Sequence, residues 1–143
     1  MLPTGSSHID AERAFAHAAR ARRRAAILNR LRRRCAACGR LPVFDTHAAR
    51  RAAGLGIREI PLAAIAGTVE PSRAQQFDSD FRPARPARSR WERVWLAEHH
   101  GAVLPPISVI AVGDRYAIRD GHHRVSVARA RGALTIDAIV DAV

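Results

Sequence analysis

The chain has 143 residues and a formal net charge of +11 at pH 7. A chain of this length supports one ordinary hydrophobic core, because domains typically run to roughly 100–150 residues. No segment approaches the roughly 20 apolar residues of a membrane span, and the N-terminus lacks the apolar core of a signal peptide. We therefore expect one globular cytoplasmic domain with an extension and no membrane partner.

The positive charge is concentrated in the first part of the chain. Residues 1–56 hold 12 arginines against three acids, whereas residues 57–143 hold 12 arginines against 10 acids. Such an imbalance attracts phosphate polymers or anionic surfaces without sequence recognition, which makes nucleic acid the first partner to consider. The interpretation is a disordered segment 1–7, a basic helical extension 8–56 and a folded domain 57–143.

The extension is expected to begin with a basic helix over about residues 8–35. Three interpretations stay open for it: a solvated helix docked on the domain, a contact with nucleic acid, or a helix that binds a membrane surface or a partner. Aromatic residues for base stacking are nearly absent, so a DNA contact would be to the backbone. The helix is predicted because apolar residues recur at threes and fours, namely Ile9, Phe15, Ala18, Ala19, Ala26, Ile27, Leu31 and Cys35.

The only two cysteines, Cys35 and Cys38, form a Cys-x-x-Cys pair. Such a pair can be half of a zinc site or a redox pair, and His47 is a candidate third ligand. A fourth ligand and the strand-then-helix context of a thioredoxin-like site are both missing. We therefore predict no metal site and expect two small residues that pack in a reducing cytoplasm.

Residues 40–56 are expected to form a connecting helical segment. Gly39 ends the first helix, Pro42 prevents its resumption, and Gly54 stops the next helical stretch. From Ile57 onward the pattern changes to a short strand and turn.

The stretch from Gly67 to Arg90 is polar and long for a simple connection. Loops of this length in compact domains are usually functional or disordered, so it is a candidate lid or substrate-facing segment. A helix is expected from Trp91 to His100, with both of its tryptophans as core anchors.

The last third of the chain predicts a regular alternation of elements. A β-hairpin is expected from Ile107–Ala111 and Tyr116–Asp120, with a turn at Gly113-Asp114. A helix follows at His122–Arg131 and a final strand at Thr135–Val140. The order of strands and helices indicates a small α+β domain.

The segment Asp120-Gly121-His122-His123-Arg124 lies where a strand ends and a helix begins. Unpaired backbone N–H groups and the helix dipole converge there, so an anion is favoured. Gly121 lets the backbone approach a phosphate, Arg124 can donate two parallel hydrogen bonds, and His122 and His123 can donate or accept. Asp120 is a candidate helix cap or a ligand for a histidine or Mg²⁺. The simpler alternative is a capped helix with two exposed histidines.

This turn, followed by a helix, a glycine and a short strand, resembles the ParB/sulfiredoxin-like superfamily over roughly residues 57–143. The resemblance implies a ParB N-terminal/sulfiredoxin-like α+β fold, a small mixed sheet with packed helices, here preceded by the basic N-terminal helix. The spacing resembles short ParB N-terminal-domain-like proteins at Ile60-Pro61, Gly67-Thr68-Val69, Phe77-Asp78, Asp80-Phe81-Arg82-Pro83, Arg90-Trp91 and Leu104-Pro105-Pro106.

The resemblance implies that the turn binds nucleotide phosphates. ParB has a Gly-Glu-Arg-Arg version that cradles CTP, and sulfiredoxin has Gly-Cys-His-Arg, which cradles ATP. Gly121 and Arg124 match both, and His123 matches sulfiredoxin. His122 replaces the catalytic cysteine of sulfiredoxin, which excludes sulfinic acid reduction by that route, and Ser126 replaces a further arginine of ParB, which weakens the case for CTP.

Our first functional hypothesis is a nucleotide-binding module whose arginine arm contacts DNA backbone, which would associate it with the nucleoid. Its ligand is a nucleoside triphosphate, CTP or ATP, with or without Mg²⁺, held by the turn and by Arg73. The arm contact would use the basic helix 8–35, and a homodimer is left open. Because the sequence ends at Val143, we do not expect the helix-turn-helix domain or the partition function of ParB.

Catalysis is left open, with two alternatives. A phosphotransferase resembling a free serine kinase would use the same turn, with Glu70 as the base and Asp120 near the metal. A ParB-like nuclease would need converging carboxylates, for which Asp78, Asp80 and Asp120 are scattered candidates.

Overall fold

The computed structural model describes residues 5–32, 38–45 and 56–142. Five strands form one mixed sheet in the order β1-β5-β3-β4-β2, with β1 antiparallel to β5, β5 parallel to β3, β3 antiparallel to β4 and β4 parallel to β2. This confirms the expected α+β class and mixed sheet. The strands are β1 (Ile57–Pro61), β2 (Ile65–Thr68), β3 (Ile107–Val112), β4 (Arg115–Asp120) and β5 (Thr135–Ala142).

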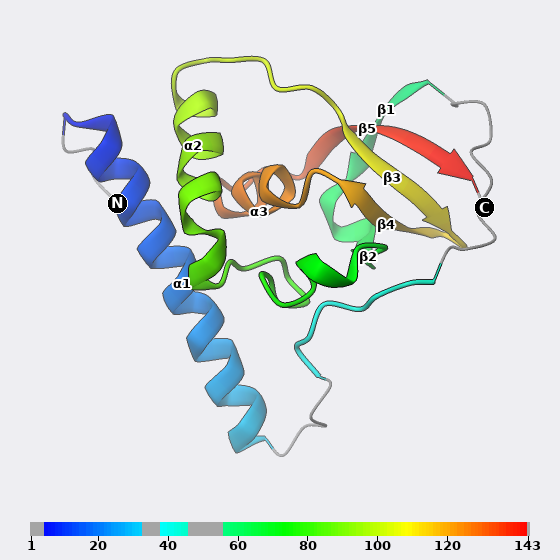
Figure 1. Ribbon diagram of the computed structural model, residues 1–143, viewed down its shortest axis with the longest axis horizontal. Helices are drawn as coiled ribbons and strands as arrows, with labels where there is room; N and C mark the ends of the chain where they lie inside the picture. Colours follow the sequence, from blue (N-terminus) through cyan, green and yellow to red (C-terminus); the bar gives the residue numbers. More distant parts are fainter. Residues whose placement is uncertain (1–4, 33–37, 46–55, 143) are drawn as a thin grey trace.

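The three α-helices of the described residues lie to one side of the sheet, in the order α1, α2, α3 toward the strands (Figure 1). They are α1 (Ser7–Leu31), α2 (Arg88–His99) and α3 (His122–Ala130). Trp91 of α2 is fully buried, and its ring meets that of Phe15 edge-on at a centroid distance of 5.6 Å. Its indole N–H donates to Ser126 Oγ of α3 at 2.8 Å, so one side chain joins all three helices. Both tryptophans are core anchors, as predicted.

The two halves of α1 have different surroundings. Its first half packs into the core through Ala11, Phe15, Ala18 and Ala19. Its second half projects beyond α2 and exposes Ile27, Leu28 and Leu31 among the arginines (Figure 1). The helix is therefore docked on the domain, and it ends at Leu31, before the predicted end at Cys35.

Residues 40–45 are extended, so the expected helical segment is wrong over this part of 40–56. Val43 pairs in parallel with Thr68 of β2, the Phe44 N–H donates to Thr68 O at 2.8 Å, and the Thr68 N–H donates to Pro42 O at 2.9 Å. A Cβ at Gly67 would contact Pro42 O and lie 2.7 Å from the Phe44 ring, so glycine permits this close approach. The expected helix after residue 45 lies outside the described residues.

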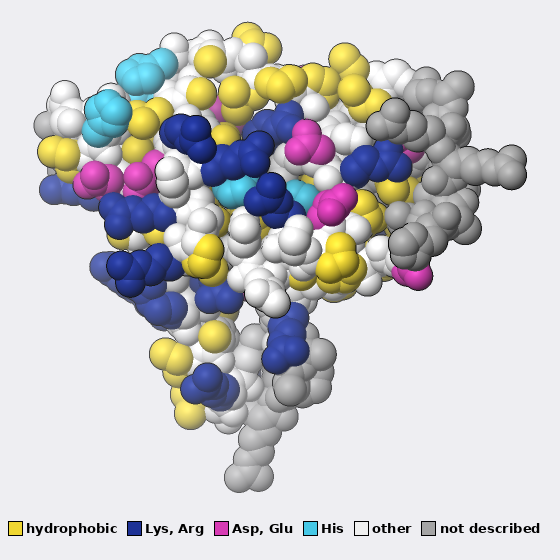
Figure 2. All heavy atoms as spheres, in the orientation of Figure 1, with side chains coloured by type: hydrophobic (Ala, Val, Ile, Leu, Met, Phe, Trp, Pro, Cys, Tyr) yellow, Lys and Arg dark blue, Asp and Glu magenta, His cyan; other side chains and the backbone are white. Residues whose placement is uncertain are grey.

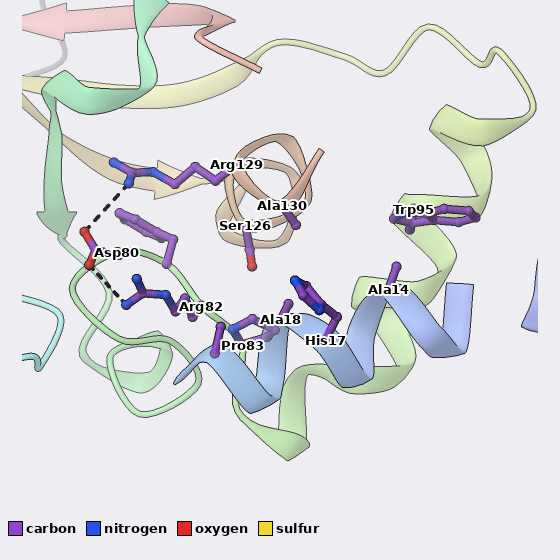
Figure 3. A pocket seen from close by; sticks show the side chains of 12 residues that line it. Ala14, His17, Ala18, Asp80, Arg82, Pro83, Trp95, Ser126, Arg129 and Ala130 are labelled. Atoms are coloured by element: carbon purple, nitrogen blue, oxygen red, sulfur yellow. Dashed lines mark hydrogen bonds and ion pairs between the residues drawn. The ribbon is translucent and has the colours of Figure 1, made fainter. Parts of the chain in front are cut away.

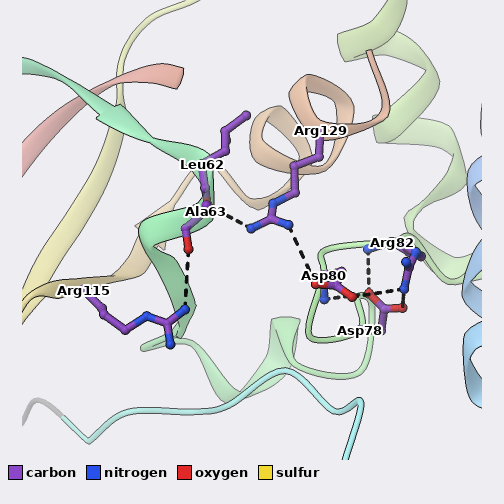
Figure 4. A network of polar contacts seen from close by, with 7 residues as sticks. All are labelled: Leu62, Ala63, Asp78, Asp80, Arg82, Arg115 and Arg129. Carbon is purple, nitrogen blue, oxygen red and sulfur yellow. Dashed lines mark hydrogen bonds and ion pairs between the residues drawn. The ribbon is translucent and has the colours of Figure 1, made fainter. Parts of the chain in front are cut away.

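The stretch 67–90 packs against the domain. Phe77 and Phe81 are both 1% exposed, although Phe81 has a positive φ of 60°. Asp78 closes a tight turn, because its Oδ1 accepts the N–H groups of Asp80 at 3.0 Å and Arg82 at 2.8 Å (Figure 4). Burial raises the pKa of Asp78, and the hydrogen bonds and positive charge of Arg82 oppose that rise.

Two further expectations concern the chain outside the sheet. Cys38 is disulfide-bonded, so the expected pair of packed thiols is wrong there, while Cys35, the other cysteine of the sequence, lies outside the described residues. Within the described part of the chain, no helix has the length and apolar character needed to cross a membrane.

Candidate functional site

The turn between β4 and α3 depends on Gly121. This residue is the N-cap of α3 and has a φ of +114°, in the left-handed region that favours glycine. A Cβ here would lie 2.7 Å from Ile107 Cβ and still closer to Ile107 Cγ2. The first helical hydrogen bond runs from the Val125 N–H to Gly121 O at 3.0 Å. The N–H groups of residues 122–124 therefore have no acceptor within the helix and are available to a ligand.

His122 is held by a hydrogen-bond network around Thr68 of β2. Thr68 Oγ1 lies 2.6 Å from His122 Nε2, donates to Ile118 O at 3.2 Å and accepts the Glu70 N–H at 2.9 Å. The hydroxyl has one proton, and the carbonyl of Ile118 needs it. All three contacts are satisfied when His122 carries its proton on Nε2 and donates it to Thr68. His122 is 4% exposed, so the expected alternative of two exposed histidines is wrong here.

His123 is also buried, at 6% exposed, and shares an aromatic neighbour with His122. The Phe77 ring stacks on His122 at a centroid distance of 6.2 Å and meets His123 edge-on at 5.2 Å. Burial, together with the charges of Arg73 and Arg90, lowers the pKa of each histidine from 6.5 to about 4. Both imidazoles are therefore neutral near pH 7, and their surroundings are positive.

Arg124 is held by the protein itself. Its Nη1 donates to Pro105 O at 2.6 Å and Pro106 O at 3.1 Å, and its Nη2 pairs with Asp120 Oδ2 at 3.1 Å. The Arg124 donors that were expected to bind a phosphate in parallel thus donate to protein oxygens instead. Asp120 does not cap the helix, because Gly121 is the N-cap of α3. The Asp120 carboxylate pairs with Arg124 instead.

These elements enclose a small pocket of about 80 Å³. Arg73 from the loop and Arg90 from α2 face the start of α3 across it, and neither forms an ion pair with a described residue. Figure 2 shows basic side chains gathered around histidine in the middle of this face. The pocket brings together all the predicted binding residues, and it is lined by Arg73, Arg90, Val94, Leu104, Asp120, Gly121, His122, His123 and Arg124.

Glu70, the predicted base, does not line this pocket. It is exposed, and only its backbone N–H joins the network, through Thr68. Asp78 and Asp80 belong to the tight turn of the 67–90 loop. Within residues 5–32, 38–45 and 56–142, no three histidine, cysteine or acidic side chains are grouped closely enough to hold a metal ion.

Sequence reasoning missed three of the lining residues, Arg90, Val94 and Leu104. Arg90 and Val94 are four residues apart on α2, so they share one face of that helix. A signal was present, because the buried Trp91 fixes the rotation of α2 and hence the direction in which its neighbour Arg90 leaves the core. Which element α2 would face could not be derived from its own sequence.

Comparison with known proteins gives a partial likeness to a solved structure. No family model matches this chain, and no curated protein matches it. Among solved structures, the chain is similar to sulfiredoxin from Arabidopsis thaliana, with 22% sequence identity, a TM-score of 0.44, and coverage of 62% of this chain and 86% of that one.

Proposed function

We propose that this chain binds a phosphate group of a nucleotide, CTP or ATP, in the pocket at the start of α3. The observation that carries this proposal is the convergence of Arg73 and Arg90 on the free N–H groups of residues 122–124. Each feature alone is common on protein surfaces. Together they supply a localised positive potential and directed donors, which is what a phosphate needs.

The two neutral histidines support the same reading. Burial is the main cause of the low pKa of both His122 and His123, and the positive charges of Arg73 and Arg90 lower it further. An anion in the pocket would offset those charges and raise both pKa values. His122 is already committed to Thr68, so it contributes shape and neutrality to the pocket wall.

The size of the pocket fits a phosphate group better than a whole nucleotide. A volume of about 80 Å³ corresponds to roughly two or three water molecules, at ~30 Å³ each. A phosphate group is of that order, whereas the sugar and base would extend onto the surrounding surface. Recognition would therefore depend on phosphate far more than on base.

The second half of the proposal concerns α1, which we infer contacts nucleic-acid backbone. Five of its arginines are exposed, and none of them pairs with a described acidic side chain. The apolar residues in the second half of α1 are all aliphatic, so this helix offers no aromatic ring on which a base could stack. The exposed residues are Arg13, Arg20, Arg23, Arg24 and Arg30.

Calorimetry with CTP, ATP, GTP and inorganic triphosphate tests the pocket. We expect all four to bind with similar affinity, because the phosphates carry the interaction, and Arg73→Gln or Arg90→Gln to weaken binding by roughly tenfold. Arg58→Gln is the matched control, because Arg58 is exposed on β1 and the substitution removes the same charge at a position that does not line the pocket. Affinities no better than millimolar for all four ligands would refute the proposal.

DNA retention tests the α1 half separately. With about four phosphate contacts, the logarithm of affinity should fall with the logarithm of salt concentration with a slope of about −4, with little dependence on base sequence. Replacing the five exposed arginines by glutamine should remove binding. Retention that survives this replacement would show that α1 does not make the contact.

A phosphotransferase remains the second candidate, favoured by one contact. The Glu70 N–H and His122 Nε2 both bond to Thr68 Oγ1. The backbone of Glu70 is therefore linked through Thr68 to a histidine that lines the pocket. Glu70→Gln with unchanged turnover of a nucleotide and a hydroxyl acceptor would remove Glu70 as the base.

A further inference from the structure

A second cavity, of about 660 Å³, lies between α1, α2, α3 and the loop at residues 80–83 (Figure 3). It shares no lining residue with the pocket at the start of α3. Its volume falls within the roughly 300–1,000 Å³ of small-molecule sites. The first part of α1 forms one wall, so the cavity exists only with that helix docked.

One wall of this cavity, formed by α1, is apolar and runs from Trp95 toward Arg82 (Figure 3). Ala14, Ala18 and Ala21 line it at positions i, i+4 and i+7 of α1, so they share one face of that helix. Their small side chains leave a hollow between α1 and the rest of the domain. Trp95 forms the opposite side, and its ring is held by stacking on His99 at 4.7 Å and by Arg131 at 5.3 Å. Trp95 and the alanines together give this part of the cavity an apolar lining.

The end of the cavity at Arg82 carries two arginines and one carboxylate. Arg82 uses the same nitrogen, Nη1, for Asp78 at 3.3 Å and Asp80 at 3.2 Å, so its Nε and Nη2 donors have no described protein acceptor. Arg129 donates from Nη2 to Leu62 O at 2.8 Å (Figure 4), while its Nε is buried and unpaired among the described residues. Asp80 also pairs with Arg129 at 3.9 Å, so Asp78 and Asp80 balance the charges of the two arginines, and what this wall has left over is N–H donors without described acceptors.

Ser126 adds a polar group to the cavity wall. Its Oγ accepts the indole N–H of Trp91, which leaves the hydroxyl proton without an assigned acceptor among the described residues. Figure 3 shows His17 of α1 on the opposite wall, pointing toward α3. Polar groups therefore face the cavity from both sides.

We propose that this cavity binds a small amphipathic carboxylate. Its flat apolar body lies between Trp95 and the alanines of α1, and its carboxylate accepts hydrogen bonds from Arg82. A carboxylate suits this end, because an arginine donates to it from two parallel N–H groups. A ligand in this position contacts α1 and α3 together, so it also holds α1 against the domain.

The probes are 2-naphthoate and its uncharged analogue 2-naphthamide, titrated into the whole wild-type chain and followed by amide chemical shifts. We expect naphthoate to shift the amides around Ala18, Arg82 and Trp95 and to bind roughly tenfold more tightly than naphthamide, because only the carboxylate gains charge-assisted bonds. Equal affinities, or shifts confined to the start of α3, would overturn the proposal.

Two pairs of variants locate the site. Ala14→Leu fills the apolar part of the cavity and should abolish naphthoate binding, whereas Ala16→Leu, on the exposed side of the same helix, should not. Arg82→Gln should weaken naphthoate roughly tenfold and leave naphthamide unchanged, while the exposed Arg85→Gln should change neither. Unaltered binding in both Ala14→Leu and Arg82→Gln would overturn the proposal. The wild-type comparison of the two probes decides the matter if a variant does not fold.

Discussion

The two buried histidines make a quantitative prediction about stability and pH. Each has a pKa of about 4 in the folded chain, compared with 6.5 for an unperturbed histidine. Above pH 6.5 both are neutral in the folded and unfolded states, so the full stability is present. As the pH falls below 6.5, the unfolded chain takes up protons that the folded chain cannot, and stability is lost until the pH reaches about 4.

The expected loss follows from these pKa values. A shift of one pKa unit corresponds to about 1.4 kcal/mol, so each histidine should remove about 2 kcal/mol between pH 7 and pH 5. Two histidines then give a loss of about 4 kcal/mol, a large share of the roughly 5–15 kcal/mol that stabilises a typical domain. Burial raises the pKa of Asp78 and Glu98, which acts in the opposite direction at the acidic end of the range.

Urea denaturation at several pH values between 5 and 8, in buffers without phosphate or citrate, measures this loss. His123→Gln should remove about half of the pH dependence, since it removes one of the two groups. His17→Gln is the matched control, because His17 is exposed on α1. A loss below about 1 kcal/mol from pH 7 to pH 5, or one removed by His17→Gln, would refute the reasoning.

Three substitutions test other parts of the account by denaturation. Gly121→Ala should destabilise the fold by about 2–4 kcal/mol, because it adds a positive-φ penalty to a clash with Ile107; a neutral effect would contradict the described turn. Thr68→Val should cost about 1–3 kcal/mol by leaving the Nε2–H of His122 without an acceptor, and the His122 proton resonance should shift. Phe15→Ala should cost about 3–5 kcal/mol and loosen α1, seen as faster amide exchange along that helix; unchanged exchange would mean that α1 is held by other contacts.

The later elements could be predicted because their signals are local. The hairpin before α3 follows from alternating apolar residues around Gly113-Asp114, and α3 follows from the turn at Gly121 and its end at Gly132. The extended residues 40–45 could not be predicted, because they pair with Thr68, which is distant in sequence. The tight turn at Asp78 could not be predicted either, because a side chain that accepts hydrogen bonds from backbone N–H groups looks in the sequence like any other polar residue of a loop.

The candidate site was predictable in part for the same reason. The turn at residues 120–124 could be predicted because its residues are consecutive in the sequence. Arg90 belongs to α2, and its position at the pocket depends on how the helices pack. The sequence suggested Arg124 as a phosphate ligand, but in the fold its guanidinium bonds to Pro105, Pro106 and Asp120. Arg73 and Arg90 are therefore the arginines with donors to offer.

The most direct test of the central claim is an amide chemical-shift titration of the full chain with inorganic triphosphate. Binding at the start of α3 predicts the largest shifts at the N–H groups of His122, His123 and Arg124, and side-chain pKa values of both histidines that rise with occupancy. The Arg90→Gln variant should require roughly tenfold more triphosphate for the same shifts. Shifts spread along the arginines of α1, with residues 122–124 unchanged, would contradict the claim.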